Sequence, residues 1–260
     1  LEQGAEDNHV HLNLVSTGTF QSAQEEHTIV KRELDGEADG VIVEPYSSEA
    51  DVVLPTESAK PVVLVGTGIE TDRLFTSVMT DHGKLGKSLA DAVIQGKAVK
   101  VGILSGNQSQ LGMRQRLKSV KDKLEEAGIE ISWILSEKEL DKKMRNVEYF
   151  AEHPVDTVIS LDNDDTEKAV DIILNDDSIS WKLYGEGRSE KLIYYLDKGT
   201  IQELAVPNEY YMGYQSIVLA AQNIRYYTDK TEQAEVEFYM VSKDNLYDEE
   251  TSRILFPAVR

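Results

Sequence analysis

The sequence predicts an α/β protein built from two lobes, each a parallel sheet covered by helices. Its 260 residues are enough to bury one large hydrophobic core or two ordinary ones. Short, nearly continuous β-branched runs, which are typical of strands buried on both faces, occur at residues 41–43, 62–65, 101–104 and 155–159. Helical patterns separate these runs. The regular alternation of strand and helix predicts doubly wound sheets.

The helical pattern is clearest at residues 112–127. Leu117, Val120 and Leu124 recur there at intervals of three and four, and Gly128 follows as the expected C-terminal cap. Further helices are expected at residues 84–94, 165–174 and 210–227. A polar linker is expected at residues 228–235, followed by a strand at residues 236–241.

The start of the chain predicts an unusual first sheet. Residues 10–15 alternate apolar and polar side chains, which indicates an edge strand with one solvated face. The residues from Leu1 to Ala5 have the pattern of the end of a helix. In a sheet of strand order 2-1-3-4-5, the strand between residues 10–15 and 41–43 is then expected upstream of Leu1. The strand at residues 41–43 is therefore expected to lack a parallel partner on that side.

The composition excludes several classes of partner. The 47 acidic and 27 basic residues give a net charge of -20, which repels a nucleic-acid backbone. No apolar run approaches the roughly 18 residues that a membrane-spanning helix needs. The chain has no cysteine, which excludes disulfides, thiolate catalysis and cysteine-ligated zinc. We expect neither a nucleic-acid partner nor a transmembrane segment.

No catalytic residue, metal site or cofactor is predicted. The five histidines show no i, i+4 pair and no ligand spacing with acidic residues. The acidic run at Asp162, Asp164 and Asp165 lacks the glycine and the closing glutamate of a calcium loop. The segment Gly66-Thr67-Gly68 lacks the third glycine of a dinucleotide fingerprint, and Ser105 has no ordered triad. A binding protein is therefore favoured over an enzyme.

Several segments, taken in order, resemble the type I periplasmic-binding-protein superfamily, which includes ribose-binding proteins and lac-repressor cores. The resemblance covers nearly the whole chain. Its most specific part is the strand and Asn-Asp pair of residues 153–164 (HPVDTVISLDND), and the Met-Gly step of residues 211–214 (YMGY) supports it. The remaining segments are residues 38–45 (ADGVIVEP), 60–65 (KPVVLV), 78–82 (VMTDH) and 113–116 (MRQR).

The resemblance implies two doubly wound parallel-sheet lobes joined by a three-segment hinge, with a ligand cleft that closes by hinge bending. The implied N-terminal lobe comprises residues 1–80 and 208–240, and the C-terminal lobe comprises residues 81–207 and 241–260. The implied function is extracytoplasmic capture of a small polar ligand, a sugar or polyol, for an ABC importer or a membrane sensor. The end of the chain is similar to surface-anchored sugar-binding proteins of Gram-positive bacteria, so an extracellular, anchored location is expected.

The candidate ligand residues follow the strands, because ligands of open α/β sheets sit beyond the carboxyl ends. Amide and carboxylate acceptors beside an arginine suit the hydroxyls of a polyol. The charged pair that ribose-binding proteins carry is absent at Val65 and Gly66. The candidates are Thr17, Tyr46 and Thr67 in the first lobe, Asp81 and Asn208 at the hinge, and Arg114, Glu137, Asn163, Asp164 and Glu186 in the second lobe.

Each candidate also has a structural interpretation. Arg116 competes with Arg114 for the ligand-facing role, Asn163 suits a helix N-cap, and Glu186 lies in a turn-like Gly-Glu-Gly segment. We expect Asn163, Arg114 and Glu186 to face one interlobe cleft. The alternative function is the effector-binding core of a lac-repressor-like transcription regulator, although no DNA-binding segment is present in the sequence.

Overall fold

The chain divides into two compact units, each of which is described by itself. The structure, a computed structural model, describes residues 1–15, 22–49, 60–72, 74–144, 148–226 and 231–256. The first unit comprises Leu1–Asp81, Ser109–Gly112 and Asn208–Glu237. The second comprises His82–Gln108, Met113–Pro207 and Phe238–Arg260.

The first unit contains a four-stranded sheet in the order β1-β2-β3-β9, and all three pairings are parallel. The strands are β1 (Val41–Val43), β2 (Val62–Gly66), β3 (Thr76–Thr80) and β9 (Gln233–Val236). The short β-branched sequences of β1 and β2 suit strands covered on both faces. The predicted strands at residues 41–43 and 62–65 are therefore confirmed.

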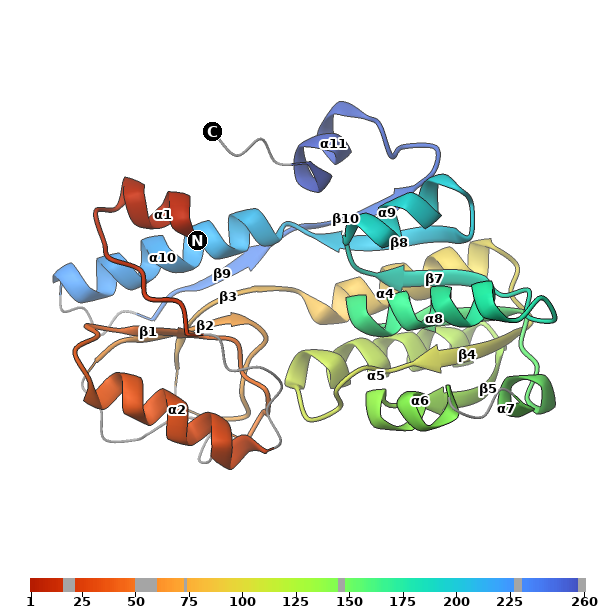
Figure 1. Ribbon diagram of the computed structural model, residues 1–260, viewed down its shortest axis with the longest axis horizontal. Helices are drawn as coiled ribbons and strands as arrows, with labels where there is room; N and C mark the ends of the chain where they lie inside the picture. Colours follow the sequence, from red (N-terminus) through yellow and green to blue (C-terminus); the bar gives the residue numbers. More distant parts are fainter. Residues whose placement is uncertain (16–21, 50–59, 73, 145–147, 227–230, 257–260) are drawn as a thin grey trace. The chain divides into compact units, whose positions relative to one another are not determined.

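Alternate side chains of β2 point to opposite helical layers of the first unit. Leu64 packs with Val30 and Leu34 of α2 (Ala23–Asp35), whereas Val63 packs with Met212 and Leu219 of α10 (Glu209–Tyr226). Figure 1 shows α2 on one side of this sheet and α10 on the other. The short helix α1 (Glu2–Asp7) packs on α10, where Gly4 approaches the backbone of Tyr214.

The edge strand predicted at residues 10–15 is wrong. These residues form no strand, and Leu14 is 76% exposed. Alternation sets which side chains face inward, but a strand also needs a neighbour that accepts its hydrogen bonds. Within the described part of the chain, the only strand that pairs with β1 is β2.

The second unit contains a six-stranded sheet in the order β10-β8-β7-β6-β4-β5. All neighbours are parallel except β10, which runs antiparallel to β8 at the edge. The strands are β4 (Lys100–Leu104), β5 (Glu130–Leu135), β6 (Thr157–Ser160), β7 (Lys182–Glu186), β8 (Ile201–Pro207) and β10 (Phe238–Ser242). The predicted class, α/β with parallel sheets, is confirmed.

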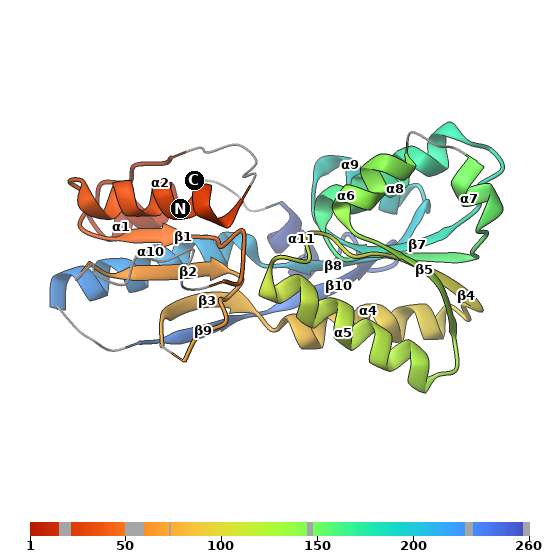
Figure 2. The ribbon, with the colours of Figure 1, turned by 90° about the horizontal axis from the view of Figure 1, so that it is seen from below.

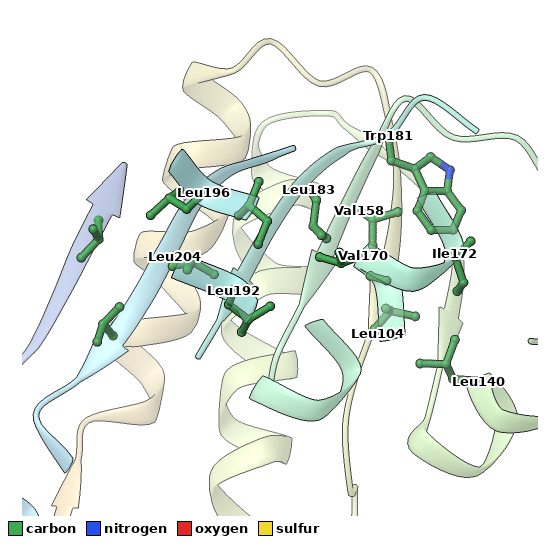
Figure 3. Close-up of a cluster of buried hydrophobic side chains, with 14 of the residues drawn as sticks. Leu104, Leu140, Val158, Val170, Ile172, Trp181, Leu183, Leu192, Leu196 and Leu204 are labelled. Carbon is green, nitrogen blue, oxygen red and sulfur yellow. The ribbon is translucent and has the colours of Figure 1, made fainter. Parts of the chain in front are cut away.

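Helices cover both faces of this second sheet, as Figure 2 shows. One layer contains α4 (His82–Gln95) and α5 (Leu111–Glu126), which pack on Val101 and Ile103 of β4. The other layer is built around the cluster drawn in Figure 3, in which Leu183 of β7 packs with Leu192 and Leu196. Its helices are α6 (Glu137–Lys143), α7 (Glu148–Glu152), α8 (Asn163–Asn175), α9 (Glu190–Asp197) and α11 (Glu249–Leu255).

The predicted end of the chain is corrected in two places. The linker expected at residues 228–235 contains the start of β9, and the single strand expected at residues 236–241 is divided at Glu237. The chain changes sheets there, because β9 pairs with β3 while β10 pairs with β8. The four predicted helices are present with ends shifted by a few residues, and Gly128 ends α5 with a positive φ of 69°.

The close approach of Trp133 to Gly102 predicts a measurable cost of enlarging this glycine. A Cβ at Gly102 of β4 would lie 2.2 Å from Cζ2 of Trp133 on β5. Gly102→Ala is expected to lower the free energy of unfolding by about 1 to 3 kcal/mol, because the buried indole must move. Urea unfolding measures this loss, and Trp133→Phe in the same chain should recover part of it. Equal losses with and without Trp133→Phe would exclude the steric explanation.

Candidate functional site

The carboxyl edge of the second sheet collects most of the candidate residues of that unit. The strands β4, β6 and β7 are parallel neighbours, so the residues that follow Leu104, Ser160 and Gly185 lie along one edge. Glu137 follows β5 at the same edge, and its backbone N–H donates to the carbonyl of Gly106 at 3.2 Å. Parallel topology therefore brings together groups that are far apart in the sequence.

A buried ion pair joins α5 to the end of β7. Nη1 of Arg116 lies 3.2 Å from Oε2 of Glu186, and both side chains are less than a tenth exposed. The same nitrogen donates to the carbonyl of Leu161 at 2.5 Å, and Nε donates to Nδ1 of His82 at 3.0 Å. Since Nδ1 of His82 accepts this bond, a neutral His82 carries its proton on Nε2. The pair fixes Glu186 from inside the unit.

Arg114 occupies a different environment from Arg116. Its side chain is half-buried, and Nη1 donates to the carbonyl of Gln108 at 3.4 Å. The structure therefore gives the internal role to Arg116 and leaves Arg114 nearer the surface of the edge. The sequence left open which arginine faces the ligand. The structure shows that Arg116 is the buried one.

Asp162 and Asp165 form a closely coupled carboxylate pair beside this edge. Asp162 caps α8 by accepting the backbone N–H of Asp165 at 2.7 Å. Asp165 is fully buried, accepts the N–H of Gly106 at 3.1 Å, and lies 3.4 Å from Nζ of Lys168. Burial, with the charge of Asp162, raises the pKa of Asp165 to about 7. Burial also raises the pKa of Asp162, so both carboxyls are protonated more readily than exposed aspartates.

Asn163 ties the end of β6 to the end of β7. Its Oδ1 accepts the backbone N–H groups of Arg188 and Ser189 at 3.2 and 3.3 Å. Its Nδ2 lies 3.4 Å from carboxylate oxygens of Asp164 and Glu167. The Asp164 side chain itself is exposed at the first turn of α8. The structure therefore brings Glu137, Asn163, Asp164 and Glu186 to one edge, with Asn163 already holding the loop that follows β7.

In the first unit, the candidates Tyr46 and Thr67 follow adjacent strands. The backbone N–H of Tyr46 donates to Oε1 of Glu26 at 2.8 Å. Thr67 is buried, and its Oγ1 accepts the N–H of Gly112 at 2.9 Å, so this hydroxyl anchors the segment Ser109–Gly112. Thr17 lies outside the described residues.

The two hinge candidates lie where the chain passes from one unit to the other. Asp81 is half-buried between β3 and α4, at the end of the first unit's first segment. Asn208 begins the third segment of that unit, and its Oδ1 accepts the N–H of Tyr211 at 3.0 Å. Asn208 is therefore the N-cap of α10.

The sequence reasoning missed Glu26. It is fully buried on α2, four and eight residues before the buried Val30 and Leu34. A charged residue in step with an apolar helical stripe is the signal that could have identified it. The same signal exists for Arg116, which lies four and eight residues before Val120 and Leu124.

The described residues contain no group of three or more acidic, histidine or cysteine side chains arranged to hold a metal ion. None of the helices within those residues is long and apolar enough to cross a membrane.

Residues 1–227 match a family profile described as periplasmic binding protein domain. A comparison with curated protein sequences gives no match. The fold is similar to that of a carbohydrate transporter solute-binding protein from Agrobacterium radiobacter in complex with D-arabinose, with a TM-score of 0.86 and 16% identity. That alignment covers 98% of this chain and 91% of the other.

Two further solved structures have similar folds. One is GanP, a glucose-galactose binding protein from Geobacillus stearothermophilus, with a TM-score of 0.82, 22% identity and coverage of 95% and 91% of the two chains. The other is the Caulobacter myo-inositol binding protein bound to myo-inositol, with a TM-score of 0.83, 18% identity and coverage of 97% and 89%. At these identities the likeness shows the fold.

Proposed function

The chain belongs to the periplasmic binding protein family, and from this membership we propose that it captures a sugar or related polyol outside the cytoplasm and catalyses no reaction. The ligand is then delivered to an ABC importer or presented to a membrane sensor. The bound ligands of the similar structures, D-arabinose and myo-inositol, support a polyhydroxylated ligand. An anchored position at the cell surface is part of the proposal.

The observation that carries the proposal is the polar carboxyl edge of the second sheet. Glu137, Asn163 and Asp164 supply carboxylate and amide groups there, and Arg114 supplies a guanidinium. Hydroxyl groups both donate and accept, so a polyol needs acceptors and donors within reach of one another. Each ligand hydroxyl that loses water without a partner costs about 1 to 3 kcal/mol, which makes such a mixed edge selective.

The internal contacts support different roles for the candidates. We assign ligand contact in the second unit to Glu137, Asp164 and Arg114, whose side chains are half-buried or exposed. Glu186 and Asn163 stabilise the edge, since Glu186 pairs with Arg116 and Asn163 accepts backbone N–H groups of the loop after β7. In the first unit we assign ligand contact to Tyr46, while Thr67 and Asn208 accept backbone N–H groups. Thr17 and Asp81 stay predicted ligand residues.

A thermal-shift series with D-arabinose, D-glucose, D-galactose and myo-inositol tests the proposal. A ligand at one hundred times its Kd stabilises the native state by about 2.7 kcal/mol. For a chain of this size that corresponds to a rise in Tm of about 5 to 10 °C. At least one of these compounds is expected to give such a shift. Shifts below 1 °C for all of them would contradict a sugar-binding function.

Two matched variants locate the binding edge once a sugar is found. Glu137→Gln is expected to weaken its binding about tenfold or more, because a charge-assisted hydrogen bond to a hydroxyl is lost. Glu148→Gln makes the same chemical change at the exposed start of α7, before β6 and thus at the opposite edge of the same sheet. Titration calorimetry measures both, and an equal loss in the two variants would refute the assigned edge.

A further inference from the structure

A carboxyl group is buried beneath the loop that follows β1. Glu26 lies in the first turns of α2, and its side chain is fully buried among the residues of the first unit. Its Oε1 accepts the backbone N–H of Tyr46 at 2.8 Å. The link joins residues twenty positions apart and fixes the loop to the helix beneath it.

The same loop is held at its other residues by backbone-directed bonds. Nε2 of Gln110 donates to the carbonyl of Pro45 at 3.0 Å, and the N–H of Ser48 donates to the carbonyl of Ser109 at 2.9 Å. The carbonyl of Ser48 accepts the N–H of Glu70 at 2.8 Å. The loop is thus tied to neighbouring segments at Pro45 and Ser48 through the Gln110 amide and backbone groups, whereas the carboxyl of Glu26 accepts the Tyr46 amide.

The surroundings of Glu26 disfavour a negative charge. The backbone N–H groups of Tyr46 and Ser47 favour the ionised form, but Oε2 is buried and has no hydrogen-bond partner among the described residues. The carboxylate of Glu44, at the end of β1, adds repulsion from the neighbouring element, and Glu25 and His27 flank Glu26 on α2. The dipole of α2 favours a charge in its first turn. Burial nevertheless raises the pKa of Glu26, with Glu44 as a smaller cause in the same direction.

We propose that Glu26 is a positioning residue of the ligand site and acts as a neutral carboxylic acid, whose carbonyl oxygen holds the Tyr46 loop in its binding geometry. The inference rests on the proposed function only in taking this loop as part of the ligand site. Ionisation of Glu26 places an uncompensated charge beneath the loop. A group with a raised pKa stabilises the folded form at low pH and loses that contribution as the pH rises through its folded value. Ordering of the Tyr46 loop, and sugar affinity with it, therefore falls as the pH rises through the titration of Glu26.

The variants Glu26→Gln and Glu26→Ala test this, with Glu25→Gln as the control that removes an adjacent, exposed carboxylate. Two readouts need no ligand. The first is the carboxyl ¹³C signal of Glu26, assigned by its absence from Glu26→Gln, and the second is the exchange protection of the Tyr46 amide across a pH series. The third readout is the affinity for D-galactose or myo-inositol, measured by titration calorimetry over the same series.

At the acidic end of the series the Glu26 carboxyl is expected to be protonated, and Glu26→Gln and Glu25→Gln are expected to keep wild-type protection at Tyr46. Glu26→Ala is expected to lose protection at least tenfold. As the carboxyl titrates, protection falls in the wild type and in Glu25→Gln but shows no step in Glu26→Gln. A Glu26 carboxyl that titrates no higher than the exposed Glu25, or loss of protection in Glu26→Gln, overturns the proposal. Absence of sugar binding in every variant counts against the proposed function. The carboxyl signal and the amide protection, which need no ligand, still test the role of Glu26.

Discussion

Replacing Arg116 by methionine is expected to lower the free energy of unfolding by about 3 to 5 kcal/mol, because it removes one partner of the buried Arg116–Glu186 ion pair. Arg116 donates to Glu186, to the carbonyl of Leu161 and to His82, so three acceptors lose their donor at once. Methionine keeps most of the aliphatic volume, which separates the lost charge from a cavity. Urea unfolding, followed by tryptophan fluorescence, measures the loss.

Two variants control this result. Arg114→Met makes the same change two residues earlier on α5, at a half-buried position, and is expected to cost less than about 1 kcal/mol. The double variant Arg116→Met/Glu186→Leu removes both charges of the pair and is expected to recover much of the lost stability. If the double variant is as unstable as Arg116→Met alone, packing rather than the remaining carboxylate determines the loss.

Replacing Asp165 by asparagine is expected to stabilise the second unit above neutral pH by an amount on the order of 3 kcal/mol. The folded pKa of Asp165, about 7, lies above the ordinary value of 3.8, so the folded state binds more protons between these values. The free energy of unfolding of the wild type therefore falls as the pH rises from about 4 to about 7. Asparagine carries no titrating proton and can still accept the N–H of Gly106.

The measurement is the difference in unfolding free energy between variant and wild type at pH 4.5, 6 and 8. The difference is expected to be smallest at pH 4.5 and to favour Asp165→Asn increasingly at higher pH. Asp164→Asn removes the exposed neighbouring carboxylate and serves as the matched control, because it leaves the buried pair in place. A difference that does not change with pH would show that the pKa of Asp165 is not raised in the folded state.

The strands of the two sheets were predictable where the local sequence pattern alone distinguishes a buried strand from other structure. Runs such as residues 41–43 and 101–104 are apolar without interruption, which only a strand covered on both faces tolerates. The assignment of residues 10–15 failed because alternation of side chains does not provide a pairing partner. The break at Glu237 was also beyond local reasoning, because it is set by the pairing of the two sides with different distant strands, β3 and β8.

The candidate site was predictable as a set of strand ends but not as a set of contacts. The rule that ligands lie beyond carboxyl ends of strands placed Glu137, Asn163 and Asp164 along one edge. Whether an amide or a carboxylate faces inward depends on donors from distant segments, as with Asn163 and the N–H groups of Arg188 and Ser189. The rotation of α5 about its axis determines which of Arg114 and Arg116 is buried. The apolar positions Val120 and Leu124 already indicate that rotation, because Arg116 lies on the same helical face.

The division at Glu237 has a consequence for biosynthesis. Both sheets receive a strand from one short late segment, Gln233–Ser242, of which β9 joins β3 and β10 joins β8. Until the ribosome has released that segment, β3 and β8 each lack a neighbour, and open strand edges recruit other chains. If translation stops before residue 233, neither sheet has its full set of strands. A truncated product is therefore expected to aggregate or to be degraded, because neither unit can complete its sheet.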